Sequence, residues 1–139
     1  MSTPNRRIVV GDTATQFSWR SQASQYAYRD TPGLSCEQHS VGVLGALTIV
    51  DCLLWRDEDG LLRGILNHYP DGALRYPSTA PLEEPGNITL WVDPQRQRRG
   101  IATALIREAV RRWNIDFDQQ RYTPAGLALI EKFERQTPE

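Results

Sequence analysis

The chain has 139 residues, the length of one ordinary domain, which is enough to bury a single hydrophobic core. Hydrophobic residues make up 40% of it and charged residues 24%, proportions that exclude a disordered chain and fit a globular protein in water. The formal net charge of −1 argues against a dedicated nucleic-acid binder. We therefore expect one domain over residues 1–139.

The chain shows no pattern of a membrane or exported protein. The apolar run Val41–Val50 contains two glycines and is closed by Asp51, so it is far shorter than the ~20 residues of a spanning helix. Near the N-terminus, Arg6 and Arg7 are followed by only three apolar residues, too few for a secretion signal. These features predict a cytoplasmic protein with no membrane partner.

The cysteines and histidines do not form a metal-binding pattern. Cys36 and Cys52 are too far apart for a CxxC pair, and no histidine cluster accompanies them. His39 and His68 are isolated from each other and from carboxylates at ligand spacing. We expect two reduced, buried thiols, two histidines in surface or satisfied polar positions, and no metal.

The first half of the chain predicts mainly a hairpin. A short strand is expected around Arg7–Val10, and the mixed pattern of Thr15–Ser40 is read as short helices. Thr48–Arg56 and Leu61–Tyr69 are apolar, partly β-branched runs on either side of a DEDG turn, which predicts two antiparallel strands. The segment Asp71–Asn87 is rich in proline and glycine and predicts a long loop.

A strand and a helix then follow in succession. Between residues 88 and 93 apolar and polar side chains alternate as in a half-buried strand, and Pro94 ends it because proline has no amide proton. After Gly100, apolar residues recur on one face of a helix that should end near Asn114. These residues are Ala102, Leu105, Ile106, Ala109, Val110 and Trp113.

The last part of the chain predicts a second strand and a second helix. Ile115–Asp118 is the strand candidate. The sequence YTPAGLALIEKF follows, with Thr123 as N-cap, Pro124 at the first helical position, and Tyr122 placed to pack against Leu127. An order of strand, helix, strand and helix favours two parallel strands covered by helices.

Basic charge is concentrated where the strand at 88–93 leads into its helix. The stretch Gln95–Arg112 holds six arginines and one acid, Glu108. A loop that enters a helix exposes unpaired amides, and the helix dipole adds positive potential there, so phosphate is a natural ligand. The alternative is a solvated loop whose arginines only keep the protein soluble.

The pattern of this turn is more specific than its charge. Neither a Walker A loop nor the dinucleotide fingerprint GxGxxG occurs here. The residues follow V-x-P-x-x-Q-x-x-G-x-A instead, with Val92, Pro94, Gln97, Gly100 and Ala102 in the specified positions. This resembles the acyl-CoA-binding motif Q/R-x-x-G-x-G/A of the GNAT superfamily of N-acyltransferases. The resemblance covers about residues 48–133 in element order, although its specific residues lie within 88–105.

The resemblance implies an α/β (α+β) fold with a mixed, mostly antiparallel central sheet flanked by helices, lacking the family's last two strands. Residues 1–139 would form a single GNAT-like acyl-CoA-binding domain. The strand at Ile115–Asp118 would splay from the strand at 88–93 and leave room for a thioester. A sheet edge exposed by the shortened C-terminus would favour a homodimer.

The resemblance also implies how acetyl-CoA, the acyl donor, would be held. Trp91 and Val92 would hydrogen-bond the pantetheine arm through their backbone, and Gln97 would stabilise the loop. The pyrophosphate would lie among Arg98, Arg99, Gly100, Ile101, Ala102 and Thr103. An amine would attack the thioester directly, which requires a base for the amine proton, an oxyanion donor, and an acid for the leaving thiolate.

The catalytic groups depart from the family pattern. Where relatives often hold an acid upstream of the motif, this chain has Gly86 and Asn87, so Glu84 in the preceding loop is the candidate base, acting through a water. The usual tyrosine acid is replaced by Ile130, and Tyr122 is the substitute candidate. The alternatives are a solvated surface acid at Glu84 and a purely structural Tyr122.

Two other functions remain open. Ile130 and the short C-terminus favour a CoA-binding protein without turnover. The arginine-lined helix favours a DNA- or RNA-modifying relative of the same superfamily, against which the acidic remainder of the chain argues. The acceptor amine is not encoded in any motif found here.

Overall fold

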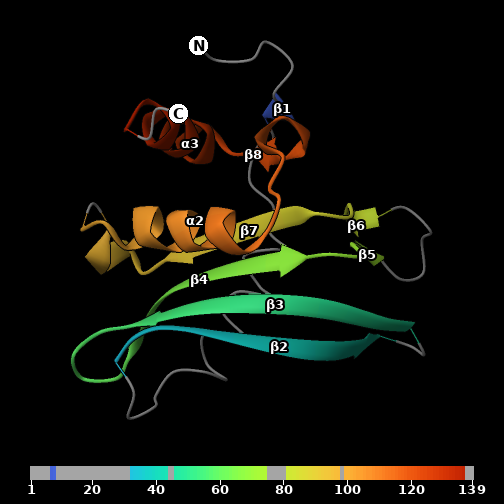
Figure 1. Cartoon of the computed structure of the whole chain (residues 1–139), viewed down its shortest axis with the longest axis horizontal. Coiled ribbons are helices and arrows are strands. Elements are labelled where there is room, and N and C mark those ends of the chain that lie inside the picture. Colours follow the sequence, from blue (N-terminus) through green and yellow to red (C-terminus); the bar gives the residue numbers. More distant parts are fainter. Residues whose placement is uncertain (1–6, 9–31, 44–45, 75–80, 98, 137–139) are drawn as a thin grey trace.

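The computed structural model describes residues 7–8, 32–43, 46–74, 81–97 and 99–136 (Figure 1). Within these ranges the chain is an α+β protein built from strands, two α-helices and two short 3-10 helices. In chain order the elements are β1 (Arg7–Ile8), β2 (Gly33–Val43), β3 (Ala46–Arg56), β4 (Leu62–Tyr69), β5 (Ala73–Leu74), β6 (Pro81–Glu83), β7 (Asn87–Val92), η1 (Pro94–Arg96), α2 (Ile101–Arg112), η2 (Phe117–Gln119), β8 (Arg121–Tyr122) and α3 (Pro124–Gln136).

The central sheet is antiparallel, with the strand order β2-β3-β4-β7. The hairpin of β3 and β4 confirms the strands expected on either side of the DEDG turn. In that turn the Asp57 carboxylate accepts the amides of Asp59 and Leu61 at 2.9 and 3.1 Å. Gly60 adopts φ 82° there, an angle at which a side chain would be strained.

Two expectations for irregular or helical segments are wrong for the residues that the structure describes. The part of Thr15–Ser40 that the structure describes belongs to strand β2, because its backbone pairs with β3 from Gly33 onward; residues 15–31 lie outside the described ranges. The expected loop at Asp71–Asn87 contains the short antiparallel pair β5 and β6. At the N-terminus, the strand expected at Arg7–Val10 is present as β1, and residues 9–10 are not described.

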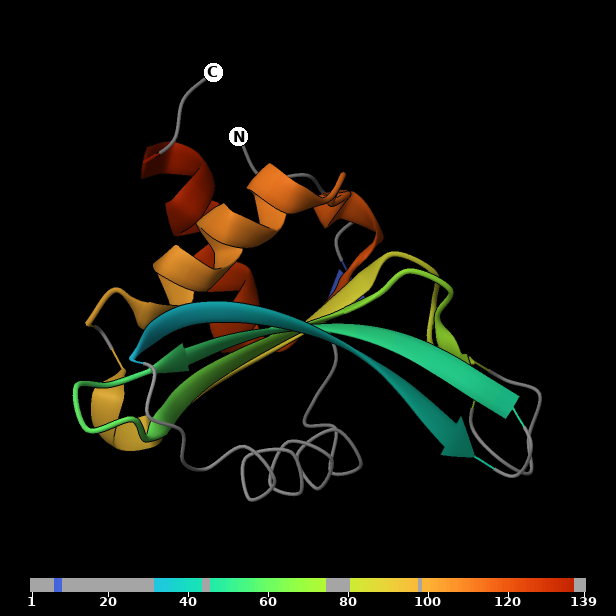
Figure 2. The same cartoon turned by 60° about the horizontal axis from the view of Figure 1, so that its bottom comes forward.

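The sheet presents a different hydrophobic cluster on each face. Leu53 on β3 and Leu66 on β4 are fully buried in the main core under α2, and Leu90 on β7 packs against it. Figure 2 shows α2 and α3 on the same side of the sheet. The other face carries a second cluster, against which Tyr69 and Trp91 pack: Val50, Cys52, Leu54, Leu62 and Ile65.

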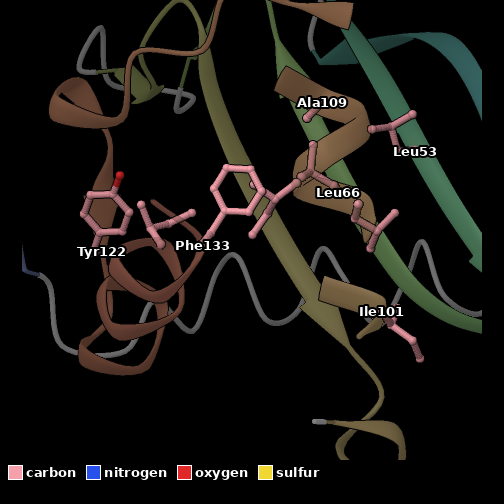
Figure 3. Close-up of a cluster of buried hydrophobic side chains, with 9 residues drawn as sticks. Leu53, Leu66, Ile101, Ala109, Tyr122 and Phe133 are labelled. Atoms are coloured by element: carbon pink, nitrogen blue, oxygen red, sulfur yellow. The ribbon is translucent and has the colours of Figure 1, made fainter. Parts of the chain in front are cut away.

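Helix α2 confirms the amphipathic pattern expected after Gly100 and packs directly on the sheet. Its buried residues are Ile101, Leu105, Ile106 and Ala109. Figure 3 shows Ile101 and Ala109 of this helix in one cluster with Leu53 and Leu66 of the sheet and Phe133 of α3. Burying a large apolar side chain stabilises the fold by about 1.5–3 kcal/mol, so these contacts fix α2 on the sheet.

The segment after α2 differs from the expected strand at Ile115–Asp118. The Asp116 carboxylate accepts the Asp118 amide at 3.0 Å and caps η2, a local hydrogen bond that competes with strand pairing. The strand of this region is β8, which pairs in parallel with β1 and not with β7. The described strands of the central sheet therefore do not form the parallel unit expected around α2.

Helix α3 begins as its sequence predicts. The Thr123 hydroxyl accepts the Gly126 amide at 3.1 Å, and Pro124 occupies the first helical position. Tyr122 and Leu127 belong to the same core, as the expected staple requires, and Ile130 is buried. No helix in the described ranges combines the length and apolar character needed to span a bilayer.

The two cysteines differ in environment. Cys52 is buried in the sheet, where desolvation raises the pKa of its thiol to about 12. The expectation of a buried thiol is wrong for Cys36, which lies exposed on β2 at an edge of the central sheet. Both are free of disulfide bonds.

Candidate functional site

The turn between β7 and α2 is anchored by Asp93. Its Oδ1 accepts the Gln95 amide at 3.0 Å and caps η1, and its Oδ2 accepts Arg63 Nη1 at 2.7 Å. The same guanidinium donates from Nε to Asp57 Oδ2 at 2.7 Å. The Gln95 amide and the Arg63 guanidinium hold the pKa of Asp93 below its usual value. Arg63 thus ties the turn before α2 to the β3–β4 hairpin.

Gly100 forms the junction between this turn and α2. It is the N-cap residue, with φ 83° in the left-handed region, and no side chain caps the helix. The first amides of a helix have no partner within the helix, so those at residues 101–103 remain available to an anion together with the helix dipole. Arg99 and Gly100 are exposed beside them. This end of α2 has the composition of an anion site.

The residues expected at the pyrophosphate do not all play the same part. Ile101 is buried and anchors the helix through its side chain, so only its backbone is available to a ligand. Ala102 and Thr103 are partly exposed in the first turn. Arg98 lies outside the described residues. Gln97 Nε2 donates to the Val92 carbonyl at 3.4 Å, a contact across the turn of the kind expected for a residue that stabilises the loop.

The register of β7 decides which of its backbone groups point away from the sheet. Asp93 donates its amide to the Arg63 carbonyl at 2.8 Å, so the residue pair 63 and 93 is hydrogen-bonded. In an antiparallel pair hydrogen-bonded and non-hydrogen-bonded positions alternate, so Trp91 directs its backbone groups to Ile65 on β4. The groups of Leu90 and Val92 point to the other side.

We call these outward amides and carbonyls of Leu90 and Val92 the open edge of β7, because no described strand pairs with them. Of the two residues expected to bind pantetheine, Val92 can offer its amide, whereas its carbonyl receives Gln97. Trp91 is placed with its backbone toward β4 and its side chain against the second cluster. Leu90, which the motif did not single out, has the outward backbone groups that were expected of Trp91.

Gln120 covers the outward side of β7 just before the open edge, at Ile88. The Gln120 Oε1 accepts the outward amide of Ile88 at 2.9 Å, and its Nε2 donates to the carbonyls of Gly86 at 3.3 Å and Asp116 at 3.1 Å. The side chain is buried, with 3% of the residue exposed. A side-chain amide therefore joins the chain after α2 to the beginning of β7, and no described strand pairs with the later part of this edge.

The two candidate catalytic residues lie in different environments. Tyr122 is buried in the core, and its hydroxyl donates to the Phe117 carbonyl at 2.5 Å. Its proton is engaged within the protein and is not directed to the open edge. Glu84 is partly exposed before β7, and its carbonyl accepts the Asn87 amide at 3.0 Å. Glu84 thus lies near the same end of β7 as Gln120.

Sequence reasoning located the arginine turn but not the polar groups around it. Leu90 and Gln120 carry no motif, and only the register of β7 and the path of residues 116–122 bring them together. His68 likewise gains a carboxylate partner, Asp51, that is distant in sequence. No set of three His, Cys, Asp or Glu side chains suited to a metal occurs within the described ranges.

In comparisons with known proteins, no family model, no curated protein and no solved structure matches the chain.

Proposed function

We propose that this protein is an acyl-CoA-dependent N-acyltransferase of the GNAT type, which transfers an acetyl group from acetyl-CoA to an amine. The observation that carries the proposal is the adjacency of two binding elements. A helix start with a left-handed glycine, Gly100, follows directly on a strand whose Leu90 and Val92 backbone groups are unpaired by any described strand. An extended ligand ending in a diphosphate needs both elements.

The residues fit the two parts of such a ligand. The amides after Gly100 and the exposed Arg99 supply hydrogen bonds and positive charge for a diphosphate. The outward amides and carbonyl on Leu90 and Val92 match an arm that contains amide groups, because such an arm can add to a sheet edge as a strand does. When bound, acetyl-CoA would supply a thioester carbonyl open to attack by an amine.

The described structure also departs from the GNAT pattern after α2. The strand expected to splay from β7 is replaced by η2 and Gln120, which hold the chain to the start of β7 only. In this arrangement the outward Ile88 amide donates to the Gln120 side chain, and no described strand pairs with Leu90 or Val92. The proposal therefore depends on the open edge and not on a second long strand.

The binding half of the proposal is tested by a charge reversal with a matched control. Arg99→Glu lies at the helix start and Arg107→Glu lies on an exposed turn of the same helix. Saturating acetyl-CoA at about 100 times its Kd should stabilise the wild type by about 2.7 kcal/mol in thermal melts. Arg99→Glu should weaken binding roughly 3- to 10-fold in isothermal titration, the effect of about one exposed charge contact.

Arg107→Glu should bind as the wild type does, because its side chain is remote from the helix start. Equal losses in both variants would indicate that net charge and not the anion site governs binding. No detectable heat or thermal shift with wild-type protein would end the proposal.

A second candidate is a CoA-binding protein without turnover. The observation in its favour is that the Tyr122 hydroxyl is engaged by the Phe117 carbonyl, while Ile130 occupies the position of the family's usual acid within the core. Release of free CoA from acetyl-CoA in the presence of small primary amines distinguishes the two. A protein that binds tightly and releases no thiol is the second candidate.

A further inference from the structure

Three polar side chains lie side by side across the central sheet, on the face covered by α2. Gln38 on β2 is opposite Asp51 on β3, and Asp51 is opposite His68 on β4. Gln38 Nε2 donates to Asp51 Oδ1 at 2.8 Å, and His68 Nδ1 lies 2.9 Å from Asp51 Oδ2. Asp51 and His68 are 8% and 7% exposed.

The pair with Asp51 selects one tautomer of the histidine. An ionised carboxylate can only accept hydrogen bonds, so His68 donates from Nδ1 to Asp51, and in the neutral imidazole Nε2 is then the acceptor. The ring is also fixed in its plane, because it stacks on Trp113 at the end of α2 with centroids 4.4 Å apart and an interplanar angle of 12°. No described residue provides a hydrogen bond to Nε2.

The histidine lies between Asp51 and β7. Its strand β4 pairs on one side with β3, which carries Asp51, and on the other side with β7. His68 is opposite Ile88, the residue whose outward amide is closed by Gln120. Neighbouring strands are about 4.8 Å apart. His68 therefore lies one strand away from the part of β7 where Gln120 binds the Ile88 amide and the open edge begins.

We propose that His68 is the general base of the acyl transfer and that Asp51 and Gln38 are positioning residues. This inference rests on the proposed function. As the nitrogen of a neutral amine forms a C–N bond to the thioester carbonyl carbon, its proton passes to Nε2. The C–S bond breaks, and the proton is then delivered to the leaving sulfur, so amine and acetyl-CoA become amide and CoA with the histidine regenerated.

Among the described residues, Asp51 is the charged side chain in contact with this histidine. Asp51 faces it from β3, and Ile88 and Trp113 bring no charge from β7 and α2. On the same face of β2, Cys36 is the nearest ionisable side chain in sequence to Gln38, and it is within electrostatic reach of Asp51, Glu108 and Arg112.

The test uses the full chain and its two histidines, of which His39 is the control. His68→Gln retains a group that can donate to Asp51 and should bind acetyl-CoA within about twofold of wild type. Thiol release from acetyl-CoA with n-butylamine should fall about 100-fold or more, the usual size of general-base catalysis. His39→Gln should react at the wild-type rate, and the protein's own thiols are subtracted from a blank.

Nuclear magnetic resonance supplies a readout that does not depend on the acceptor. The ¹⁵N shifts of His68 should report the Nδ1–H tautomer, Asp51→Asn should change that tautomer population, and acetyl-CoA should perturb the ring signals. Unchanged turnover in His68→Gln, or bound acetyl-CoA that leaves His68 signals unmoved, would overturn the base while leaving the binding site intact. Absence of acetyl-CoA binding by the wild type would overturn the proposed function and this inference together.

Discussion

A Cβ atom placed on Gly64 of β4 would lie 2.7 Å from Cγ2 of Ile101, the first residue of α2. It would also lie 3.0 Å from Cδ1 of Leu105, one turn further along the helix. Glycine at this position therefore lets the start of α2 approach the sheet. Because Gly100 immediately precedes Ile101, the same contact positions the turn that we propose binds the diphosphate.

Gly64→Ala should destabilise the protein by about 1–3 kcal/mol, the usual cost of forcing an additional methyl group into a packed core. Urea denaturation measures the change. Ile101→Ala should cost less in the Gly64→Ala background than in wild type, because the smaller side chain removes the clash. Strict additivity of the two substitutions would show that this contact does not limit the approach of α2.

Gln120→Ala should release the Ile88 amide and the Gly86 carbonyl at the start of β7. We expect a loss of about 1–3 kcal/mol, since the substitution leaves buried polar groups without partners. Hydrogen exchange should become faster at the Ile88 amide, with little change at residues 65–67, which belong to the interior strand β4. Unaltered exchange at Ile88 would mean that Gln120 does not close this edge.

Tyr122→Phe separates a structural role of the hydroxyl from a catalytic one. The substitution removes the donor to the Phe117 carbonyl and should cost about 1–2 kcal/mol of stability while leaving acetyl-CoA binding unchanged. If turnover is present in wild type, it should fall by less than about twofold at a temperature where both proteins are folded. A loss of about 100-fold would restore Tyr122 as the acid.

Glu108 is expected to stabilise α2 in a pH-dependent manner. Hydrogen bonds from Arg111 and Arg112 lower the pKa of its carboxyl to about 2, and Arg112 Nε lies 2.6 Å from Oε2. A lowered pKa means that the stabilisation is present above about pH 4.5 and is lost as the pH falls toward 2.

Thermal melts of wild type and Glu108→Gln should therefore differ at pH 6 and converge near pH 2. High salt should reduce the difference at pH 6, since the pair is near the surface. Parallel curves over the whole range would exclude this contribution. Glu131→Gln on α3 is a suitable control because the same charge is removed from another helix.

Arg63 offers a test of the link between the hairpin and the turn before α2. Arg63→Met keeps much of the aliphatic length but loses the contacts with Asp57 and Asp93, each 2.7 Å long. The variant should melt at a lower temperature and bind acetyl-CoA more weakly than wild type. The hydrogen bond from Arg63 lowers the pKa of Asp57, so the wild-type advantage should diminish as acid protonates that carboxyl.

Local sequence was sufficient where a pattern repeats within one element. The hairpin around DEDG, helix α2 and the Thr123 cap of α3 were all predictable, because periodicity, turn residues and capping act between close neighbours in the chain. The same reasoning failed at Ile115–Asp118. There the Asp116 side chain satisfies the local backbone, and the segment is held to β7 by Gln120 and not by strand pairing.

The sequence by itself was enough to locate the turn with Gly100 and its arginines at the start of α2, because the motif and the helix start are contiguous in the chain. Only the tertiary structure decided that Leu90 and not Trp91 turns its backbone outward, and that His68 meets Asp51. Both depend on how strands are aligned across the sheet. A shift of one residue would reverse every inward and outward position, and no local pattern in a single strand specifies that alignment.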